Sequence, residues 1–424
     1  MGDRIKVLSV CTSDSSGGAA RAAYRIHLAV QESGVESRMF VKHKRTTDDS
    51  VVPLRDFVPR NALYKAFDWL RNKAKNKWQH FLWGRYPDRS VLFMSDLRST
   101  DIHGALRKLD YDVLHLHWIN QRFLPLDALP KDKPIVWTLH DSWPFCGVCH
   151  LPMDCGGYLM ECGYCLALRS QAPHDLSHAI WTKKSKIYQS LDLHIVAPSQ
   201  WIAGCARKSS LLGRCDIRVI PNCIDVEAFS PGDRVAACEY THLDPKKKYL
   251  LFGAMNALRD DNKGFRFLVN ALRSISSQLP DGTELVVFGS NDAFDKEIDG
   301  IRVVDMGVIT DSRLIVSLYR AAEVAIVPSL SENLSCTIME SLSCGTPAVA
   351  FNIGGNGDLI EHGVNGYLAQ EQDEKDLAQG ILWCMEHNQD GLLSQNARRK
   401  VMENYTPEDV GSRYTNLYRS LTES

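Results

Sequence analysis

Two glutamates stand eight positions apart in the stretch SENLSCTIMESLSCGTPAVAFNIGG, where they could bind hydroxyl groups. Glu332 follows the apolar run EVAIVPSL, and a helix is predicted to begin near Asn333 or Ser335. Glu340 falls inside that helix, about 12 Å further along by the helical rise. One loop carboxylate and one helical carboxylate can accept hydrogen bonds from hydroxyls of two sugar rings. The spacing alone is a weak signal, because charged helices contain it by chance.

A lysine and an arginine follow another apolar run, KYLLFGA, in the segment NALRDDNKGF. Lys263 could neutralise an anionic group, and Arg259 lies close to it in the sequence. The alternative is that Lys263 lies in a solvated loop and binds nothing, which is the commoner situation for a single lysine.

A glycine pair, Gly17 and Gly18, opens the segment GGAARAAYRI directly after the first apolar run. Glycine lets a ligand approach the backbone, and a helix N-terminus attracts phosphate. The alternative interpretation is an ordinary tight turn between a strand and a helix.

Ten apolar runs of strand length alternate with longer stretches that are compatible with helices. The first half contains IKVLSV, SRMFV, DVLHLHW, PIVWTLH and LHIVAPS, and the second contains KYLLFGA, ELVVFGS, RVVDMG, EVAIVPS and PAVAFNI. Nearly continuous Val, Ile and Leu predicts parallel strands buried on both faces. Two such series predict an α/β protein with two doubly wound, Rossmann-like domains.

The domain boundary is predicted in the proline-containing segment 219–234, after the fifth strand. We expect an N-terminal domain over residues 1–220 and a C-terminal domain over residues 221–405. A helix over residues 406–424 is expected to return to the first domain.

Several polar residues stand at the expected carboxyl ends of strands, where such sheets bind ligands. His117 and Trp118 end one strand, and His140 with Asp141 ends the next. These positions predict a ligand cleft between the two domains. His115 and His117 lie on one face of their strand, where two histidines could bind a metal ion together. No third ligand is evident in the sequence, so we favour a buried or cleft-lining role for them.

Composition excludes several broad classes of protein. The chain has 424 residues, 44% hydrophobic and 24% charged, with a formal charge of −2. This balance gives no case for nucleic-acid binding. No apolar run is long enough for a transmembrane helix, and the N-terminal run breaks at once into TSDSSGG, so we expect a cytoplasmic protein.

Four of the thirteen cysteines form a close cluster with the spacing C-x5-C-x6-C-x2-C. Cys149, Cys155, Cys162 and Cys165 would suit a structural zinc ion with four thiolate ligands. Free thiols and disulfides are the alternatives.

Residues 60–89 mix Lys and Arg with Trp, Phe and Tyr. This composition is typical of an amphipathic helix that contacts an anionic membrane or a lipid-linked acceptor. The alternative is a surface helix whose aromatic residues pack on its own domain.

The order of the motifs resembles the retaining glycosyltransferases of family 4, which have the GT-B fold of two facing Rossmann-like domains. The resemblance rests on the stretch containing Glu332 and Glu340, together with GGAARAAYRI, TLHDSW, VIPNCIDVEAFSP, KGF and MGVITDSRLIVSLYRAAEVAIVPSLSEN. A subset of that family also resembles this chain in the cysteine-rich segment.

The resemblance assigns roles to individual residues. It implies that Glu340 binds ribose hydroxyls, that Glu332 binds the transferred sugar and that Lys263 binds the diphosphate. His140 matches the family's active-site histidine, and Ile309 should contact the base. The remaining implied contacts are Gly17, Gly18, Asn333, Leu334 and Ser335 for the donor, and Arg21, His117 and Trp118 on the acceptor side.

One departure concerns the Gly-Arg that the family usually carries after the first strand of its second domain. This chain reads FGAMNAL there, and Arg259 could supply the missing charge.

The resemblance implies a retaining hexosyltransferase that moves a sugar from a nucleoside diphosphate sugar to a glycan or lipid-linked acceptor. Such a reaction would belong to the biosynthesis of a surface polysaccharide or glycoconjugate. No D-x-D motif stands out, so we expect no catalytic metal ion. Two alternatives stay open, a nucleotide-sugar 2-epimerase and a non-catalytic nucleotide-sugar-binding protein.

Overall fold

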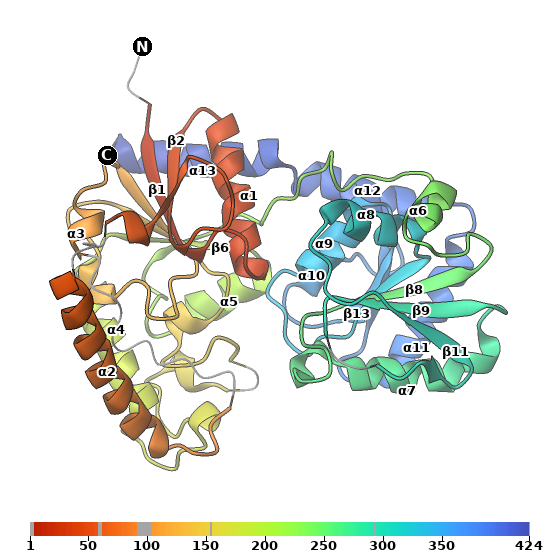
Figure 1. The fold of residues 1–424 in the computed structure, drawn as a ribbon, viewed down its shortest axis with the longest axis horizontal. Helices are drawn as coiled ribbons and strands as arrows, with labels where there is room; N and C mark the ends of the chain where they lie inside the picture. Colours follow the sequence, from red (N-terminus) through yellow and green to blue (C-terminus); the bar gives the residue numbers. More distant parts are fainter. Residues whose placement is uncertain (1–3, 58–61, 91–102, 153–154, 292–293, 424) are drawn as a thin grey trace. The chain divides into compact units, whose positions relative to one another are not determined.

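A computed structural model describes residues 4–57, 62–90, 103–152, 155–291 and 294–423. The chain forms two compact units, shown in Figure 1. Unit 1 comprises Met1–Ile220 and Val410–Ser424, and unit 2 comprises Pro221–Asp409. Within the described ranges, no helix combines the length and the hydrophobicity that crossing a bilayer would need.

Unit 1 is built on a parallel sheet of seven strands in the order β3-β2-β1-β4-β5-β6-β7. Its strands are β1 (Lys6–Ser13), β2 (Glu36–His43), β3 (Val51–Pro53), β4 (Val113–Leu116), β5 (Ile135–Thr138), β6 (Leu193–Ala197) and β7 (Asp216–Val219). Its helices are α1 (Gly18–Glu32), α2 (Ala62–Gly84), α3 (His103–Leu106), α4 (Leu176–Tyr188) and α5 (Gln200–Lys208), with most of α13 (Pro407–Thr422).

Unit 2 also has a seven-stranded sheet, in the order β10-β11-β9-β8-β12-β13-β14, with only β10 antiparallel to its neighbour. Its strands are β8 (Lys248–Gly253), β9 (Thr283–Phe288), β10 (Glu297–Ile298), β11 (Ile301–Asp305), β12 (Val324–Val327), β13 (Ala348–Phe351) and β14 (Gly366–Ala369). Its helices are α6 (Arg234–Tyr240), α7 (Phe265–Ile275), α8 (Ser312–Ala321), α9 (Cys336–Ser343), α10 (Asn356–Leu359), α11 (Glu374–His387) and α12 (Leu392–Asn404).

The central strands are buried on both faces, as their continuous apolar sequences predict. Every residue of β4, β5, β12 and β13 is buried. The ten predicted strands are all present. Strands β4 and β5 end at Leu116 and Thr138, so His117 and His140 stand in the loops just beyond them.

Helix α13 closes unit 1 through a close contact with α1. A Cβ atom at Gly411 would lie 2.3 Å from the carbonyl oxygen of Ala29 and 2.5 Å from Ser33 Oγ. Only glycine therefore allows the two helices to approach this closely. The contact brings Tyr414 and Tyr418 of α13 under the sheet, where both are buried.

Candidate functional site

The loop between β12 and α9 carries Glu332 and is tied to the segment that carries Lys263. The backbone N–H of Leu330 donates to the carbonyl oxygen of Asn262 at 2.8 Å. The Asn262 side chain donates in turn to the carbonyl oxygen of Ser331 at 3.1 Å. Ser335 caps α9 by accepting a hydrogen bond from the Ile338 N–H, as its side-chain type predicts.

These loops place Lys263 beside Glu332. The Lys263 ammonium lies 3.2 Å from Glu332 Oε1, and both side chains are largely buried. The neighbouring Glu332 carboxylate raises the pKa of Lys263, so the lysine stays charged. The pair offers a cation and a hydroxyl acceptor side by side, which suits a ligand that combines phosphate with hydroxyl groups.

Two glycines allow this arrangement because the backbone passes very close to both. A Cβ atom at Gly264 would lie 1.8 Å from the Pro328 carbonyl oxygen, and one at Gly354 would lie 1.8 Å from the Glu332 carbonyl oxygen. Both glycines also have positive φ angles, of 67° and 53°. The glycine-rich turns on either side of the glutamate pair therefore hold the Glu332 loop in place.

Replacing Gly354 by alanine should move this loop and weaken nucleotide binding. We expect a loss of about 2 kcal/mol or more in unfolding free energy, because a backbone clash adds to the left-handed strain. Gly363→Ala is the matched control, since Gly363 also has a positive φ, of 77°, but its Cβ would meet nothing within 4 Å. Urea denaturation and calorimetric titration with nucleotides would measure both. Equal effects of the two substitutions would contradict this account of the loop.

Glu340 is buried on α9, with 3% of its surface exposed. Its Oε2 atom accepts a hydrogen bond from the Tyr319 hydroxyl of α8 at 3.3 Å. Sequence reasoning missed Tyr319, because its helix carries no pattern that would mark a polar partner. Among the other predicted donor contacts, Asn333 and Ile309 are half-buried, Leu334 is buried, and Arg259 is exposed in the turn after β8.

In unit 1 the loops beyond β4 and β5 bring His117, Trp118, His140 and Asp141 together. His117 Nδ1 lies 3.0 Å from His140 Nε2. The Trp118 indole N–H donates to Asp141 Oδ2 at 2.8 Å. Burial lowers the pKa of His140 to about 4 and that of His117 well below its usual value, so both rings are neutral at pH 7.

His117 is 2% exposed, and its ring stacks on that of His140. This burial agrees with the buried or cleft-lining role that the sequence favours for His117. The acceptor-side role that the resemblance implies for it stays a prediction. Trp118 remains half-buried in the same loop.

The glycine turn after β1 has the predicted form. Gly17 adopts a positive φ of 91° and precedes α1, which begins at Gly18 and carries the half-buried Arg21. The carboxylate of Asp14 accepts hydrogen bonds from the backbone N–H groups of Arg45 and Thr46 at 2.9–3.0 Å. Asp14 thereby fastens the loop after β2 beside this turn.

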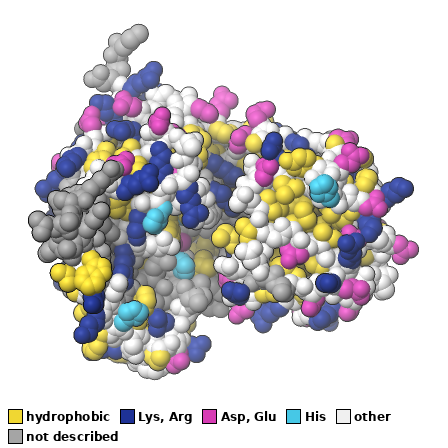
Figure 2. All heavy atoms as spheres, viewed as in Figure 1, with side chains coloured by type: hydrophobic (Ala, Val, Ile, Leu, Met, Phe, Trp, Pro, Cys, Tyr) yellow, Lys and Arg dark blue, Asp and Glu magenta, His cyan; other side chains and the backbone are white. Residues whose placement is uncertain are grey.

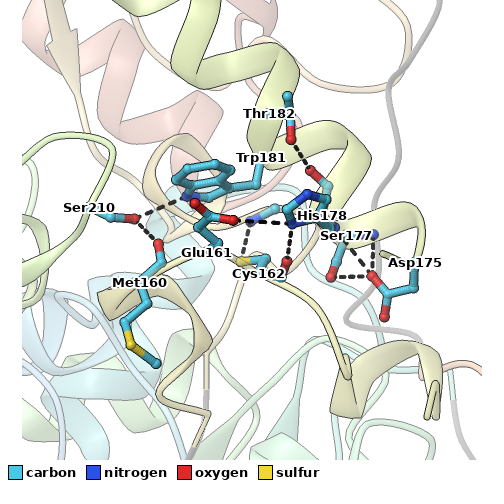
Figure 3. A network of polar contacts seen from close by, with 10 residues as sticks. Met160, Glu161, Cys162, Asp175, Ser177, His178, Trp181, Thr182 and Ser210 are labelled. Carbon is cyan, nitrogen blue, oxygen red and sulfur yellow. Dashed lines mark hydrogen bonds and ion pairs between the residues drawn. The ribbon is translucent and has the colours of Figure 1, made fainter. Parts of the chain in front are cut away.

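The cysteine-rich segment lies over the start of α4, as Figure 3 shows. Asp175 accepts hydrogen bonds from the N–H groups of Ser177 and Cys165, at 2.8 and 2.9 Å. His178 Nδ1 lies 2.9 Å from the carbonyl oxygen of Cys162. These contacts connect the segment to α4 at both ends of its C-x2-C pair.

A buried lysine of α4 binds backbone carbonyl groups at the start of the same segment. Lys184 of α4 is 0% exposed, and its ammonium donates to the carbonyl oxygens of Trp143, Cys146 and Gly147. Sequence reasoning missed Lys184, since lysine is rarely buried and no spacing marks this one.

The four predicted zinc ligands share one cavity, with Cys146 and Ser177 also in its wall. Backbone N–H groups of Gly147 and Gly157 donate to the sulfurs of Cys162 and Cys155, at 3.2 and 3.4 Å. All four cysteines are free thiols. In the parts of the chain that the structure describes, however, no three His, Cys, Asp or Glu side chains are placed to hold a metal ion. The zinc site therefore stays a prediction.

Comparison with protein families gives two matches that together cover most of the chain. The family described as Glycosyltransferase Family 4 matches residues 16–228, which is half of the chain. The family described as Glycosyl transferases group 1 matches residues 246–387.

The individual relatives have low sequence identity to this chain, but their alignments with it are long. A glycosyl transferase named for colanic acid biosynthesis, WcaC of Escherichia coli (strain K12), is 24% identical to this chain. The alignment covers 74% of this chain and 76% of WcaC. A D-inositol 3-phosphate glycosyltransferase of Rhodococcus jostii (strain RHA1) is 29% identical, covering 99% of this chain and 89% of its own. The crystal structure of Anabaena HepE in complex with UDP-glucose has a TM-score of 0.63 at 16% identity, covering 99% of this chain and 100% of that one.

Proposed function

Because the chain belongs to Glycosyltransferase Family 4, we propose that it transfers a sugar from a nucleoside diphosphate donor to a hydroxyl acceptor. The chain is a glycosyltransferase, and its two parallel-sheet units confirm the predicted GT-B fold. The observation that carries the donor proposal is the ion pair between Lys263, just before α7, and Glu332, in the loop before α9. Its cation and carboxylate match the diphosphate and the sugar hydroxyls of such a donor.

In the proposed reaction the bond between the sugar C1 and the diphosphate breaks, and a bond from C1 to the acceptor oxygen forms. The acceptor's proton goes to the leaving phosphate, and the anomeric configuration is retained. Lys263 and the N–H groups at the start of α9 stabilise the negative charge that develops on the diphosphate. Glu332 orients the sugar through its hydroxyls, and Glu340 orients the ribose.

We propose UDP as the first nucleotide to test, because HepE was solved with UDP and with UDP-glucose. The proposed acceptor is a glycan or a lipid-linked sugar, in keeping with the colanic acid biosynthesis in WcaC's name. The D-inositol 3-phosphate glycosyltransferases make a small polyol phosphate a second acceptor class to include.

Incubating the purified protein with UDP-, GDP-, ADP- and dTDP-sugars tests this function. A transferase releases nucleoside diphosphate slowly alone and faster with an acceptor, and NMR of the product gives its anomeric configuration. A 2-epimer of the donor sugar would identify the epimerase instead. Binding without turnover in the presence of acceptors would indicate a non-catalytic protein. Unchanged turnover in EDTA would support metal-independent catalysis.

We propose a structural zinc ion at Cys149, Cys155, Cys162 and Cys165 as a separate property of unit 1. The four thiols share a cavity, and the sulfurs of Cys162 and Cys155 accept hydrogen bonds from backbone N–H groups. Metal analysis of protein purified without added zinc should give about one ion per chain. Rapid alkylation of all four thiols in native, metal-free protein would refute the site.

Helix α2 is the proposed contact with an anionic membrane. Trp69 and Phe81 are 61% and 63% exposed, and Lys73 and Arg85 lie over their rings at 4.9 and 5.2 Å. Figure 2 shows basic and hydrophobic side chains together at the lower left, where Figure 1 places α2. Residues 60 and 61 of the predicted segment lie outside the described residues.

Sedimentation with anionic vesicles should carry the protein down at low salt and release it at high salt. Each basic contact contributes about 1 kcal/mol and is screened by salt. Replacing Trp69 and Phe81 by serine should release the protein further, because buried rings add apolar area. Met402→Ser, an exposed apolar residue of unit 2, is the control. Protein that stays in the supernatant at low salt would indicate an ordinary surface helix.

A further inference from the structure

A chain of buried hydrogen bonds links two tyrosines of α13 to strands β4 and β5, just before the loops that carry His117 and His140. The Tyr418 hydroxyl lies 2.7 Å from His115 Nδ1, and His115 Nε2 lies 2.8 Å from Thr138 Oγ1. The Thr138 hydroxyl continues to the Tyr414 hydroxyl at 2.9 Å. Burial lowers the pKa of His115 to about 3, so this ring is neutral and carries one proton. His115 therefore donates through one ring nitrogen and accepts at the other, and these two hydrogen bonds fix its ring.

The fixed His115 ring supports the ring of His117. Their centroids are 4.0 Å apart. The backbone of His117 is held as well, because its N–H donates to the Val10 carbonyl oxygen at 2.9 Å and its carbonyl accepts from the Trp137 indole at 3.1 Å. His117 therefore has little freedom to turn.

His117 and His140 share a single proton between Nδ1 of the first and Nε2 of the second, 3.0 Å apart. The other nitrogen of His117, Nε2, is buried without a hydrogen-bond partner in the described part of the chain. If His140 donated, this nitrogen would be a buried N–H without an acceptor. If His117 donates instead, its Nε2 atom carries no hydrogen and leaves only a lone pair buried without a partner. Orphaned buried donors are the rarer of the two, so the second arrangement is favoured.

We propose that His117 is a positioning residue that holds His140 as the Nδ1-protonated tautomer. In this arrangement His140 Nε2 accepts from His117, and His140 Nδ1–H points away from that bond. His140 is half-buried, and its Nδ1 has no partner among residues that the structure describes. The free N–H donates to a hydroxyl oxygen of the transferred sugar. This last step rests on the proposed function, whereas the tautomer does not.

Nitrogen-15 NMR of histidine-labelled protein reads the tautomer without any donor sugar. A His140→Gln variant identifies the His140 signals by their loss. We expect the Nδ1-protonated pattern for His140 in the wild type and a shift toward the Nε2-protonated form in His117→Phe. A wild-type His140 protonated on Nε2 would overturn the proposal.

Kinetics with the donor found by the screen test the consequence. His117→Phe should lower kcat about tenfold or more, because a misoriented group loses its alignment with the substrate, while nucleotide affinity stays unchanged. His117→Asn should restore most of kcat, since an asparagine amide can donate from nearly the Nδ1 position. His43→Phe, at an exposed histidine of the same unit, is the control. Equal losses in the Phe and Asn variants would argue against a positioning bond.

The two parts can fail separately. If the tautomer is as proposed but His140→Gln keeps full turnover, the role of His140 at the sugar is wrong and the hydrogen bond stands. If His140→Gln loses turnover but His140 is Nε2-protonated, the proposed function survives and this inference does not.

Discussion

Lys263→Ala is expected to lower transferase turnover by about 100- to 1000-fold, because it removes a preorganised charge from the leaving diphosphate. The same change should weaken binding of the nucleoside diphosphate far more than that of the monophosphate, which lacks the phosphate that Lys263 contacts. It also leaves the largely buried Glu332 without its 3.2 Å partner, which adds to the loss. Calorimetric titration with the two nucleotides and a turnover assay would measure these effects.

Two further variants make the result specific. Lys246→Ala removes an exposed lysine of the same unit and should change neither quantity. Glu340→Ala should weaken the monophosphate and the diphosphate about equally, because both carry the ribose. Equal affinity of Lys263→Ala for both nucleotides, at the wild-type level, would show that the lysine does not contact the diphosphate.

Acid should destabilise unit 1 strongly, because several of its histidines are buried in the neutral form. His27 is an example: its Nδ1 and Nε2 atoms lie 2.8 Å from the Ser37 and Ser50 hydroxyls, and burial lowers its pKa to about 4. The unfolded chain takes up a proton near pH 6.5, whereas the folded chain does so only near pH 4. Stability is therefore full above about pH 6.5 and is lost as the pH falls toward 4.

For His27 alone the loss at pH 5 is about 2 kcal/mol of unfolding free energy. Urea unfolding at pH 7.5 and pH 5, followed by a probe in unit 1, would measure it. His27→Leu should reduce the difference between the two pH values, and His80→Gln, at an exposed histidine, should leave it unchanged. A difference that is the same in His27→Leu as in the wild type would show that His27 is not buried neutral.

The sequence predicted the interior of each sheet but not its edges. The four strands that were missed, β3, β7, β10 and β14, are the two edges of each sheet. Edge strands here are two to four residues long. Strand β7, DIRV, has no buried residue, so its sequence lacks the apolar run that marks a central strand.

The sequence predicted which residues belong to the candidate site, but it did not predict most of the contacts between them. Strand ends and glycine turns pointed to Lys263 and Glu332 separately, and local patterns could not show that they form an ion pair across 69 positions. Tyr319, Lys184 and the tyrosines of α13 stayed hidden for the same reason. Periodicity reports which face of an element is buried, and it says nothing about the polar partner that the buried face will meet.

The return of α13 to unit 1 also sets an order for folding during synthesis. Residues 4–220 leave the ribosome first, yet Tyr418, which bonds to His115, lies 303 positions further along the chain. The whole of unit 2 is therefore made before the nascent unit 1 receives the helix that satisfies its buried histidines. Domains usually fold as they emerge, in order from the N-terminus. In this protein the second unit can reach its native state while the first still waits for its final helix.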